Sequence, residues 1–238
     1  ATEGMVLLKN EGDVLPLAAG KKLALFGNSA HDIIIGGTGS GDVHEAYSVA
    51  LPEGLEDAGY TTDRTLAQAY AEHIKAAKAR RPQTNPFLAP PPLPELVPTT
   101  EQIDAAVTAN DVGLITIGRN SGEFIDRKAK DDFYLTEAEQ TLIRTVSAAF
   151  HKAGKPVVVV LNIGGVIEVA SWRDQVDAIL LAWQPGQEAG HAMADVLSGR
   201  VNPSGKLTDT FALDLKDYPA AENFPGVTLL GPDPAARG

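Results

Sequence analysis

Short apolar runs bounded by turn residues recur along this chain, and they restrict its fold more than any other feature. Each run is entered or left through Gly, Pro, Asn or Asp, and the four are residues 22–27, 112–118, 156–162 and 176–183. They are far too short to span a bilayer. Their continuous apolar character is typical of parallel strands buried on both faces, so the pattern predicts a parallel sheet at the centre of the molecule.

Segments of helical composition separate or follow these runs. Residues 66–81 are rich in Ala and Lys, and Thr136 with Glu139 forms a capping-box pattern at the start of another candidate helix. The predicted helices are residues 66–81, 100–109, 136–152 and 187–197. Strands that alternate with helices predict an α/β fold, in which helices cover both faces of a mostly parallel sheet.

The composition limits the kind of ligand. The 31 acidic residues outnumber the 20 basic ones, the net charge is −11, and no dense block of Lys or Arg occurs. Binding to nucleic acid or to a membrane is therefore not expected, and a neutral or cationic ligand fits better. The chain has no cysteine, and its five histidines show no H-E-x-x-H pattern. We expect no metal site and no cofactor.

A proline-rich segment interrupts the alternation. Residues 82–98 contain seven prolines in seventeen residues, which neither a helix nor a central strand accepts. The segment is predicted to be an extended surface excursion. A stiff connector around the edge of the sheet is the preferred interpretation, and a wall beside a binding site is the alternative.

The loop after the first predicted strand is rich in glycine. Gly36, Gly37, Gly39 and Gly41 cluster around Thr38 and Ser40. Their spacing matches neither G-x-G-x-x-G nor G-x-x-x-x-G-K-[ST], which disfavours a nucleotide site. Two interpretations remain, a flexible turn or a place where the backbone and the Ser40 hydroxyl approach a ligand closely.

Glu123 lies between Gly122 and Phe124, in the loop that leaves the predicted strand 112–118. Ligands of open parallel sheets bind at the carboxyl ends of the strands. An acid beside apolar surface has its neutral form favoured, as a general acid requires. A glutamate that is simply solvated in a loop is the alternative. Glycoside cleavage typically uses two carboxyl groups, and no second candidate stands out.

Charged residues crowd the segment that follows Glu123. We expect them to form ion pairs that hold this loop, with Asp126 and Arg127 pinning its far side. The residues concerned are Asp126, Arg127, Lys128, Lys130, Asp131 and Asp132.

Several segments together resemble the second domain of the family 3 glycoside hydrolases, chiefly β-glucosidases. In the family's order they are residues 3–17, 21–30, 35–43, 121–135, 155–172 and 179–211. The resemblance implies a three-layer α/β/α sandwich with a mostly parallel sheet of about six strands, assigned to residues 1–215. Residues 216–238 would form a tail or linker toward a domain that this chain lacks. In the family this domain normally joins a (β/α)8 barrel.

The resemblance also implies roles for single residues. In many β-glucosidases of the family the acid/base glutamate lies in an S-G-E segment, which here is Glu123, and the nucleophile is an aspartate on the barrel. Ser40 corresponds to a contact with the sugar, and Asp42 is a weaker candidate for the same role. Phe124 stands where the family commonly has glycine, so it would either line the aglycone side or tilt the loop.

The implied activity is retaining hydrolysis of terminal, non-reducing β-D-glucosyl residues from β-linked glucosides or oligosaccharides. Without the barrel aspartate, this chain alone is expected to be inactive. Two rival hypotheses remain. One is a non-catalytic carbohydrate-binding or scaffolding domain. The other is a flavodoxin-like nucleotide-binding domain, for which nucleotides should protect the fold from heat.

Overall fold

The computed structural model describes residues 1–82, 91–121 and 127–221. Its centre is a six-stranded sheet in the order β1-β6-β5-β4-β2-β3. Neighbouring strands are parallel except for β1, which pairs antiparallel with β6. The strands are β1 Val6–Asn10, β2 Lys22–Phe26, β3 Thr61–Thr62, β4 Val112–Arg119, β5 Val157–Ile163 and β6 Ala178–Leu181.

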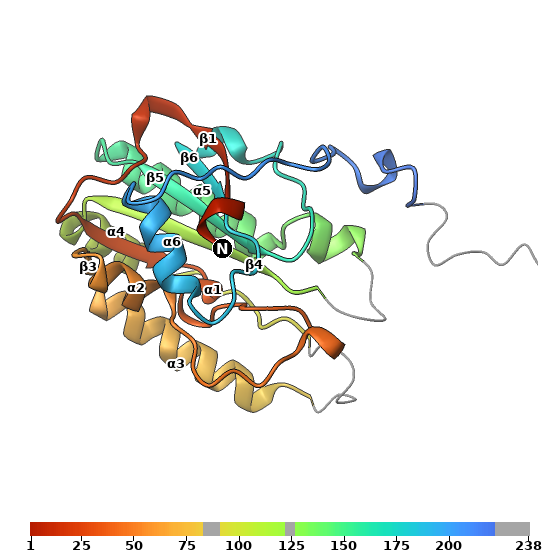
Figure 1. Cartoon of the computed structure of the whole chain (residues 1–238). Helices are drawn as coiled ribbons and strands as arrows, with labels where there is room; N and C mark the ends of the chain where they lie inside the picture. The colour runs from red at the N-terminus through yellow and green to blue at the C-terminus, as the bar shows by residue number, and fades with distance from the viewer. Residues whose placement is uncertain (83–90, 122–126, 222–238) are drawn as a thin grey trace, which may run out of the picture.

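Helices cover both faces of the sheet (Figure 1). Residues of α2 and α6 form one hydrophobic cluster with the sheet, and residues of α3, α4 and α5 form another on the opposite face. The helices are α1 Asn28–His31, α2 Leu51–Asp57, α3 Arg64–Arg80, α4 Thr100–Ala109, α5 Glu137–Lys152 and α6 Ala189–Leu197. This arrangement is a three-layer α/β/α sandwich.

The strand β5 shows why the apolar runs are continuous. All of its residues are buried. Val158 and Val160 pack in the cluster beneath α2 and α6, whereas Val157 and Val159 pack on the face that α5 covers. Because successive side chains of a strand point to opposite faces, a strand with helices on both sides needs apolar residues at every position.

The four strands and four helices expected from the sequence are all confirmed, with small shifts at their ends. The runs correspond to β2, β4, β5 and β6, and the helical segments to α3, α4, α5 and α6. The capping box of Thr136 and Glu139 is present at the start of α5. The edge strands β1 and β3 and the short helices α1 and α2 were not predicted.

The proline-rich segment is only partly within the described residues. Residues 91–98 form neither helix nor strand, as expected, but Leu93 and Leu96 pack against the core cluster on the α3 side. Residues 83–90 and 222–238 lie outside the described part, so the expected tail at 216–238 stays a prediction. No helix in the described ranges is long and apolar enough to cross a membrane.

Candidate functional site

Loops from four neighbouring strands meet at the carboxyl edge of the sheet, and Ser121 lies between them. Ser121 follows β4, and its carbonyl oxygen accepts hydrogen bonds from Thr38, whose amide nitrogen is 2.8 Å away and whose Oγ1 is 3.3 Å away. Thr38 belongs to the glycine-rich loop after β2. The glycine-rich loop and the start of the segment that carries Glu123 are therefore in direct contact.

The loop after β6 also contacts Ser121, through the side chain of Gln184. The Ser121 hydroxyl donates to Gln184 Oε1 at 3.1 Å, and Gln184 Nε2 donates to Asn120 Oδ1 at 3.0 Å. The Asn120 carboxamide oxygen also accepts from the Ser121 amide at 2.8 Å. Three loops are thus joined by hydrogen bonds around Ser121.

Two glycines leave room for these contacts. A Cβ atom at Gly37 would lie 3.1 Å from the Ser121 carbonyl oxygen, and one at Gly164 would lie 2.7 Å from Gln184 Oε1. The second distance is shorter than real Cβ atoms show. The glycine after β5 is therefore needed for the Gln184 side chain to reach Ser121.

The far end of the glycine-rich segment is fixed to the start of α6. The Val49 amide donates to the Gln187 carbonyl oxygen at 2.8 Å, and the Gly190 amide donates to the Val49 carbonyl oxygen at 2.9 Å. The Tyr47 hydroxyl donates to the Glu188 carboxylate. The segment between Thr38 and Val49 is thus held at both of its ends.

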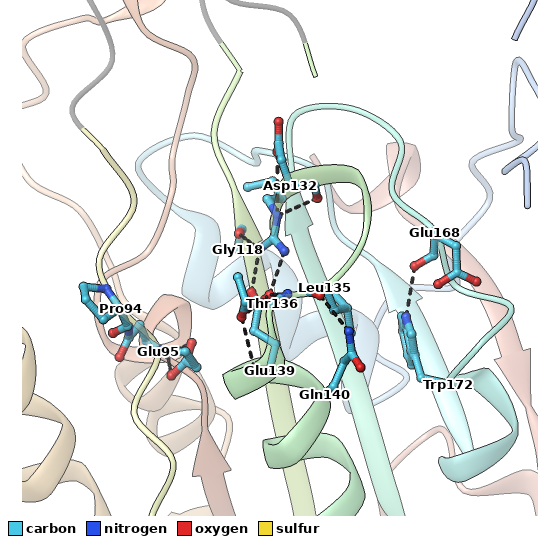
Figure 2. Close-up of polar contacts among 12 residues, drawn as sticks. Pro94, Glu95, Gly118, Asp132, Leu135, Thr136, Glu139, Gln140, Glu168 and Trp172 are labelled. Carbon is cyan, nitrogen blue, oxygen red and sulfur yellow. Dashed lines mark hydrogen bonds and ion pairs between the residues drawn. The ribbon is translucent and has the colours of Figure 1, made fainter. Parts of the chain in front are cut away.

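A buried ion pair lies at the carboxyl end of β4; Figure 2 shows its acid, Glu139, beside Thr136 at the start of α5. Arg119 ends β4, is 7% exposed, and donates to both carboxylate oxygens of Glu139, at 2.5 and 2.7 Å. Burial alone would lower the pKa of Arg119, but the hydrogen bonds and charge of Glu139 outweigh it and raise that pKa. Glu139 also accepts from the Thr136 amide at 2.8 Å, so the ion pair is continuous with the cap of α5.

Asp132 joins this pair to the other end of the loop. Its carbonyl oxygen accepts from Arg119 Nε at 2.8 Å, while its carboxylate accepts from Arg127 Nη1 at 2.5 Å and from the Lys128 amide at 2.8 Å. The expectation that the charged residues of this segment form ion pairs is confirmed for Arg127 and Asp132. Asp126 lies outside the described residues.

Glu95, in the proline-rich segment, is largely buried beside the start of α1. Its two carboxylate oxygens accept from the Asn28 amide, at 3.0 and 3.1 Å, and Oε1 also accepts from the Leu96 amide at 2.9 Å. Burial raises the pKa of Glu95 to about 7, against the opposing effect of the Asn28 hydrogen bond and with a further increase from the Glu139 charge. The segment is therefore bound to the domain through an acid that titrates near neutral pH.

Because of Glu95, the free energy of unfolding should decrease as the pH rises. The folded state raises the pKa of this group from its usual 4.5 to about 7, so its contribution is fully present below pH 4.5 and is lost as the pH rises to 7. The loss amounts to roughly 3 kcal/mol. Because Gln does not ionise, Glu95→Gln should remove this part of the pH dependence, measured as the free energy of unfolding in urea at pH 5 and pH 7.5.

The exposed Glu72 on α3 provides the control, since Glu72→Gln removes a surface carboxylate and should keep the wild-type slope. His191 has a pKa that is raised by its bonds to Asp57 and Glu188. It therefore also lowers the free energy of unfolding as the pH rises, equally in every variant. It cancels in the comparison. Identical slopes for wild type and Glu95→Gln would contradict the prediction.

The predicted site residues are only partly within the described chain. Ser40 lies in the short 3-10 helix Gly39–Gly41, Asp42 follows it, and both residues are exposed. Glu123 and Phe124 lie outside the described residues, so their roles stay predictions. No group of His, Cys, Asp and Glu that could hold a metal ion occurs in the ranges that the structure describes.

We did not predict Gln184, Arg119 or Glu95 as site residues from the sequence. One signal for Arg119 was present, because a charged residue at the end of a buried apolar strand requires a partner of opposite charge. Gln184 had no comparable signal. Its partners Asn120 and Ser121 are more than sixty residues away and become neighbours only through the strand order of the sheet.

Known proteins resemble this chain over nearly its whole length. Beta-glucosidase A of Butyrivibrio fibrisolvens is 41% identical over 94% of this chain and 29% of its own length. An exo-alpha-(1->6)-L-arabinopyranosidase of Bifidobacterium longum is 31% identical over 95% of this chain and 28% of its own. The solved structure of beta-glucosidase 3B from Thermotoga neapolitana in complex with glucose superposes with a TM-score of 0.88 and 48% identity, over 95% of this chain and 32% of that one.

The chain therefore spans less than a third of the length of these relatives. The family model described as the glycosyl hydrolase family 3 C-terminal domain matches residues 5–232. This match covers almost the entire sequence, and the fold superposes on the solved structure with a TM-score of 0.88. The chain belongs to the family of glycosyl hydrolase family 3 C-terminal domains.

Proposed function

We propose that this domain supplies Glu123 as the general acid/base of a retaining β-glycosidase that removes terminal, non-reducing β-D-glucosyl residues. The nucleophile is an aspartate on a (β/α)8 barrel outside residues 1–238. The observation that carries the proposal is the hydrogen bonding of Ser121 to Thr38. Ser121 is two residues before Glu123 in the sequence, so the segment that carries the acid begins beside the glycine-rich loop.

The carboxyl ends of parallel strands are where ligands of α/β sheets bind, and both loops start there. In the proposed site Ser40 and Asp42 contact the sugar, while Phe124 lines the aglycone side. Arg119 and Asp132 flank the segment that carries Glu123. Arg119 is held by its ion pair with Glu139, and its Nε donates to the Asp132 carbonyl oxygen, so the two residues are fixed to each other. A rigid base of this kind keeps a catalytic carboxyl group within reach of its substrate.

The reaction follows from these roles in two steps. In the first, the barrel aspartate attacks the anomeric carbon while the carboxylic acid of Glu123 gives its proton to the departing glycosidic oxygen. In the second, the Glu123 carboxylate takes a proton from water, whose oxygen bonds to the anomeric carbon and displaces the aspartate. The sugar leaves with its original configuration, and Glu123 is protonated again.

The pH profile of the full-length enzyme tests the role of Glu123. In the wild type, kcat/KM for an alkyl β-glucoside should fall at alkaline pH as the general acid loses its proton. Gln neither donates a proton nor titrates, so in Glu123→Gln the alkaline limb should disappear and a low, nearly constant rate should remain. The exposed Glu137→Gln variant, at the start of α5, serves as control and should keep the wild-type profile.

The opposite outcome is equally clear. If Glu123→Gln kept both the alkaline limb and the wild-type rate, another group would donate the proton. The domain would then bind sugar or scaffold the enzyme without taking part in the chemistry.

A further inference from the structure

The Gln184 side chain extends past the end of one strand of the sheet and contacts the loop that follows the next strand. It follows β6, whereas its partners Asn120 and Ser121 follow β4, and β5 lies between the two strands. The residue before it, Trp183, has a φ of 58°, a left-handed conformation that is rare for a bulky side chain. Asn162 Nδ2 donates to the Trp183 carbonyl oxygen at 2.8 Å. The turn that directs Gln184 across β5 is therefore held in an unfavourable conformation by a specific contact.

Both the oxygen and the nitrogen of the Gln184 carboxamide form hydrogen bonds. Oε1 accepts from the Ser121 hydroxyl at 3.1 Å, and Nε2 donates to Asn120 Oδ1 at 3.0 Å. Two bonds from one planar group fix the Ser121 and Asn120 side chains relative to each other. Because Asn120 Oδ1 also accepts from the Ser121 amide at 2.8 Å, they restrain the backbone there as well. Gly164, which follows β5, leaves the space through which this contact passes, since a Cβ there would lie 2.7 Å from Gln184 Oε1.

We infer that Gln184 is a positioning residue for the glycosidase reaction: through Asn120 and Ser121 it holds the start of the segment that bears Glu123. This inference rests on the proposed function of Glu123. Ser121 is also bonded to Thr38 of the glycine-rich loop. Gln184 therefore holds the start of the segment that carries the proton donor against the glycine-rich loop, without touching the substrate.

The test uses kcat/KM of the full-length enzyme for two substrates that differ in leaving group. Gln184→Met keeps the length of the side chain and removes both hydrogen bonds. We expect kcat/KM for an alkyl β-glucoside to fall about 10- to 100-fold, because a misplaced proton donor fails with a poor leaving group. For an activated aryl β-glucoside, whose departure needs little protonation, we expect a loss of less than about threefold.

Gly164→Ala provides a second, independent variant. It removes no hydrogen-bonding group, but the added Cβ would lie 2.3 Å from Ser121 Oγ and 2.7 Å from Gln184 Oε1. It should therefore push these two side chains apart and reproduce the same difference between the two substrates. Matched controls are Gln68→Met on the exposed face of α3 and Gly4→Ala, where a Cβ would meet nothing within 4 Å. Both controls should leave kcat/KM unchanged for both substrates.

Hydrogen exchange of residues 1–238 alone measures directly how firmly Ser121 is held against Thr38. The Thr38 amide donates to the Ser121 carbonyl oxygen, so its hydrogen exchange should speed up at least about fivefold in Gln184→Met if Gln184 holds Ser121 in place. The Gln68→Met control should exchange at the wild-type rate.

The comparison with Glu123→Ala separates the possible failures. If Glu123→Ala discriminates between the two substrates but Gln184→Met lowers both equally or neither, the positioning role is wrong and the proposed function stands. If Glu123→Ala itself does not discriminate, the proposed function fails and the inference fails with it. A discriminating loss in all three variants supports both.

Discussion

Replacing Glu123 with Ala in the full-length enzyme should lower kcat/KM for alkyl β-glucosides by about 10²- to 10⁴-fold, the usual contribution of general acid catalysis. Activated aryl β-glucosides should lose much less, because their leaving groups depart without protonation. The glycosyl intermediate should then accumulate, since no base remains to activate water. Steady-state kinetics over a series of leaving groups of graded pKa measures this directly.

Added azide should restore turnover of the activated substrates by Glu123→Ala. Azide is a small anion that needs no general base, and it should release the sugar as the β-glycosyl azide, with configuration retained. The Glu137→Ala variant is the matched control, because it removes an exposed glutamate at the start of α5. Equal losses for all leaving groups, with no azide product, would assign the proton transfer to another residue.

The second large effect is expected on stability. Arg119→Met should lower the free energy of unfolding by about 3–5 kcal/mol, because it leaves the Glu139 carboxylate buried without its partner. Both side chains are nearly inaccessible, at 8% and 6% exposure. The variant also removes the bond from Arg119 Nε to the Asp132 carbonyl oxygen. Urea unfolding of residues 1–238 measures the change.

A double variant identifies the cause of this loss. Arg119→Met with Glu139→Gln removes the uncompensated charge and should recover part of the lost stability, while Gln at the third helical position still completes the capping box. Arg144→Met on the exposed face of α5 is the control and should change stability by less than about 0.5 kcal/mol. A loss below about 1 kcal/mol in Arg119→Met would show that the buried pair contributes little.

The parts of the fold that follow from local sequence were predictable. β5 reads as an unbroken apolar run because helices cover both of its faces, and α5 begins at a capping box that is visible in the sequence. β1 was not predicted because it is an edge strand. It pairs only with β6, and its residues are mostly half-exposed, so they do not form an apolar run. β3 is two residues long, which is too short for any periodicity.

The candidate site was predictable only at the level of its loops. The glycine cluster and Glu123 both follow apolar runs, and the rule that ligands bind at the carboxyl ends of strands associates them. The contacts that hold those loops could not be predicted. Gln184 and Ser121 become neighbours through the order of the strands, which the sequence does not show. The charge of Arg119 predicts that it has a partner, but that its partners are Asp132 and Glu139 follows only from how α5 packs beside β4.

The two attachments of the glycine-rich segment, at Thr38 and at Val49, limit how far it can extend. Eleven backbone steps separate these residues, and at roughly 3.5 Å per step they measure at most about 38 Å of chain. An arc that leaves and returns to the same edge can extend no more than about half of that. The middle of the arc can therefore lie at most about 19 Å from its attachments, whereas Ser40, two steps from Thr38, can lie at most about 7 Å from the Thr38 Cα atom. A ligand that contacts Ser40 must come close to this edge, and a short insertion between Thr38 and Ser40 would change the permitted separation.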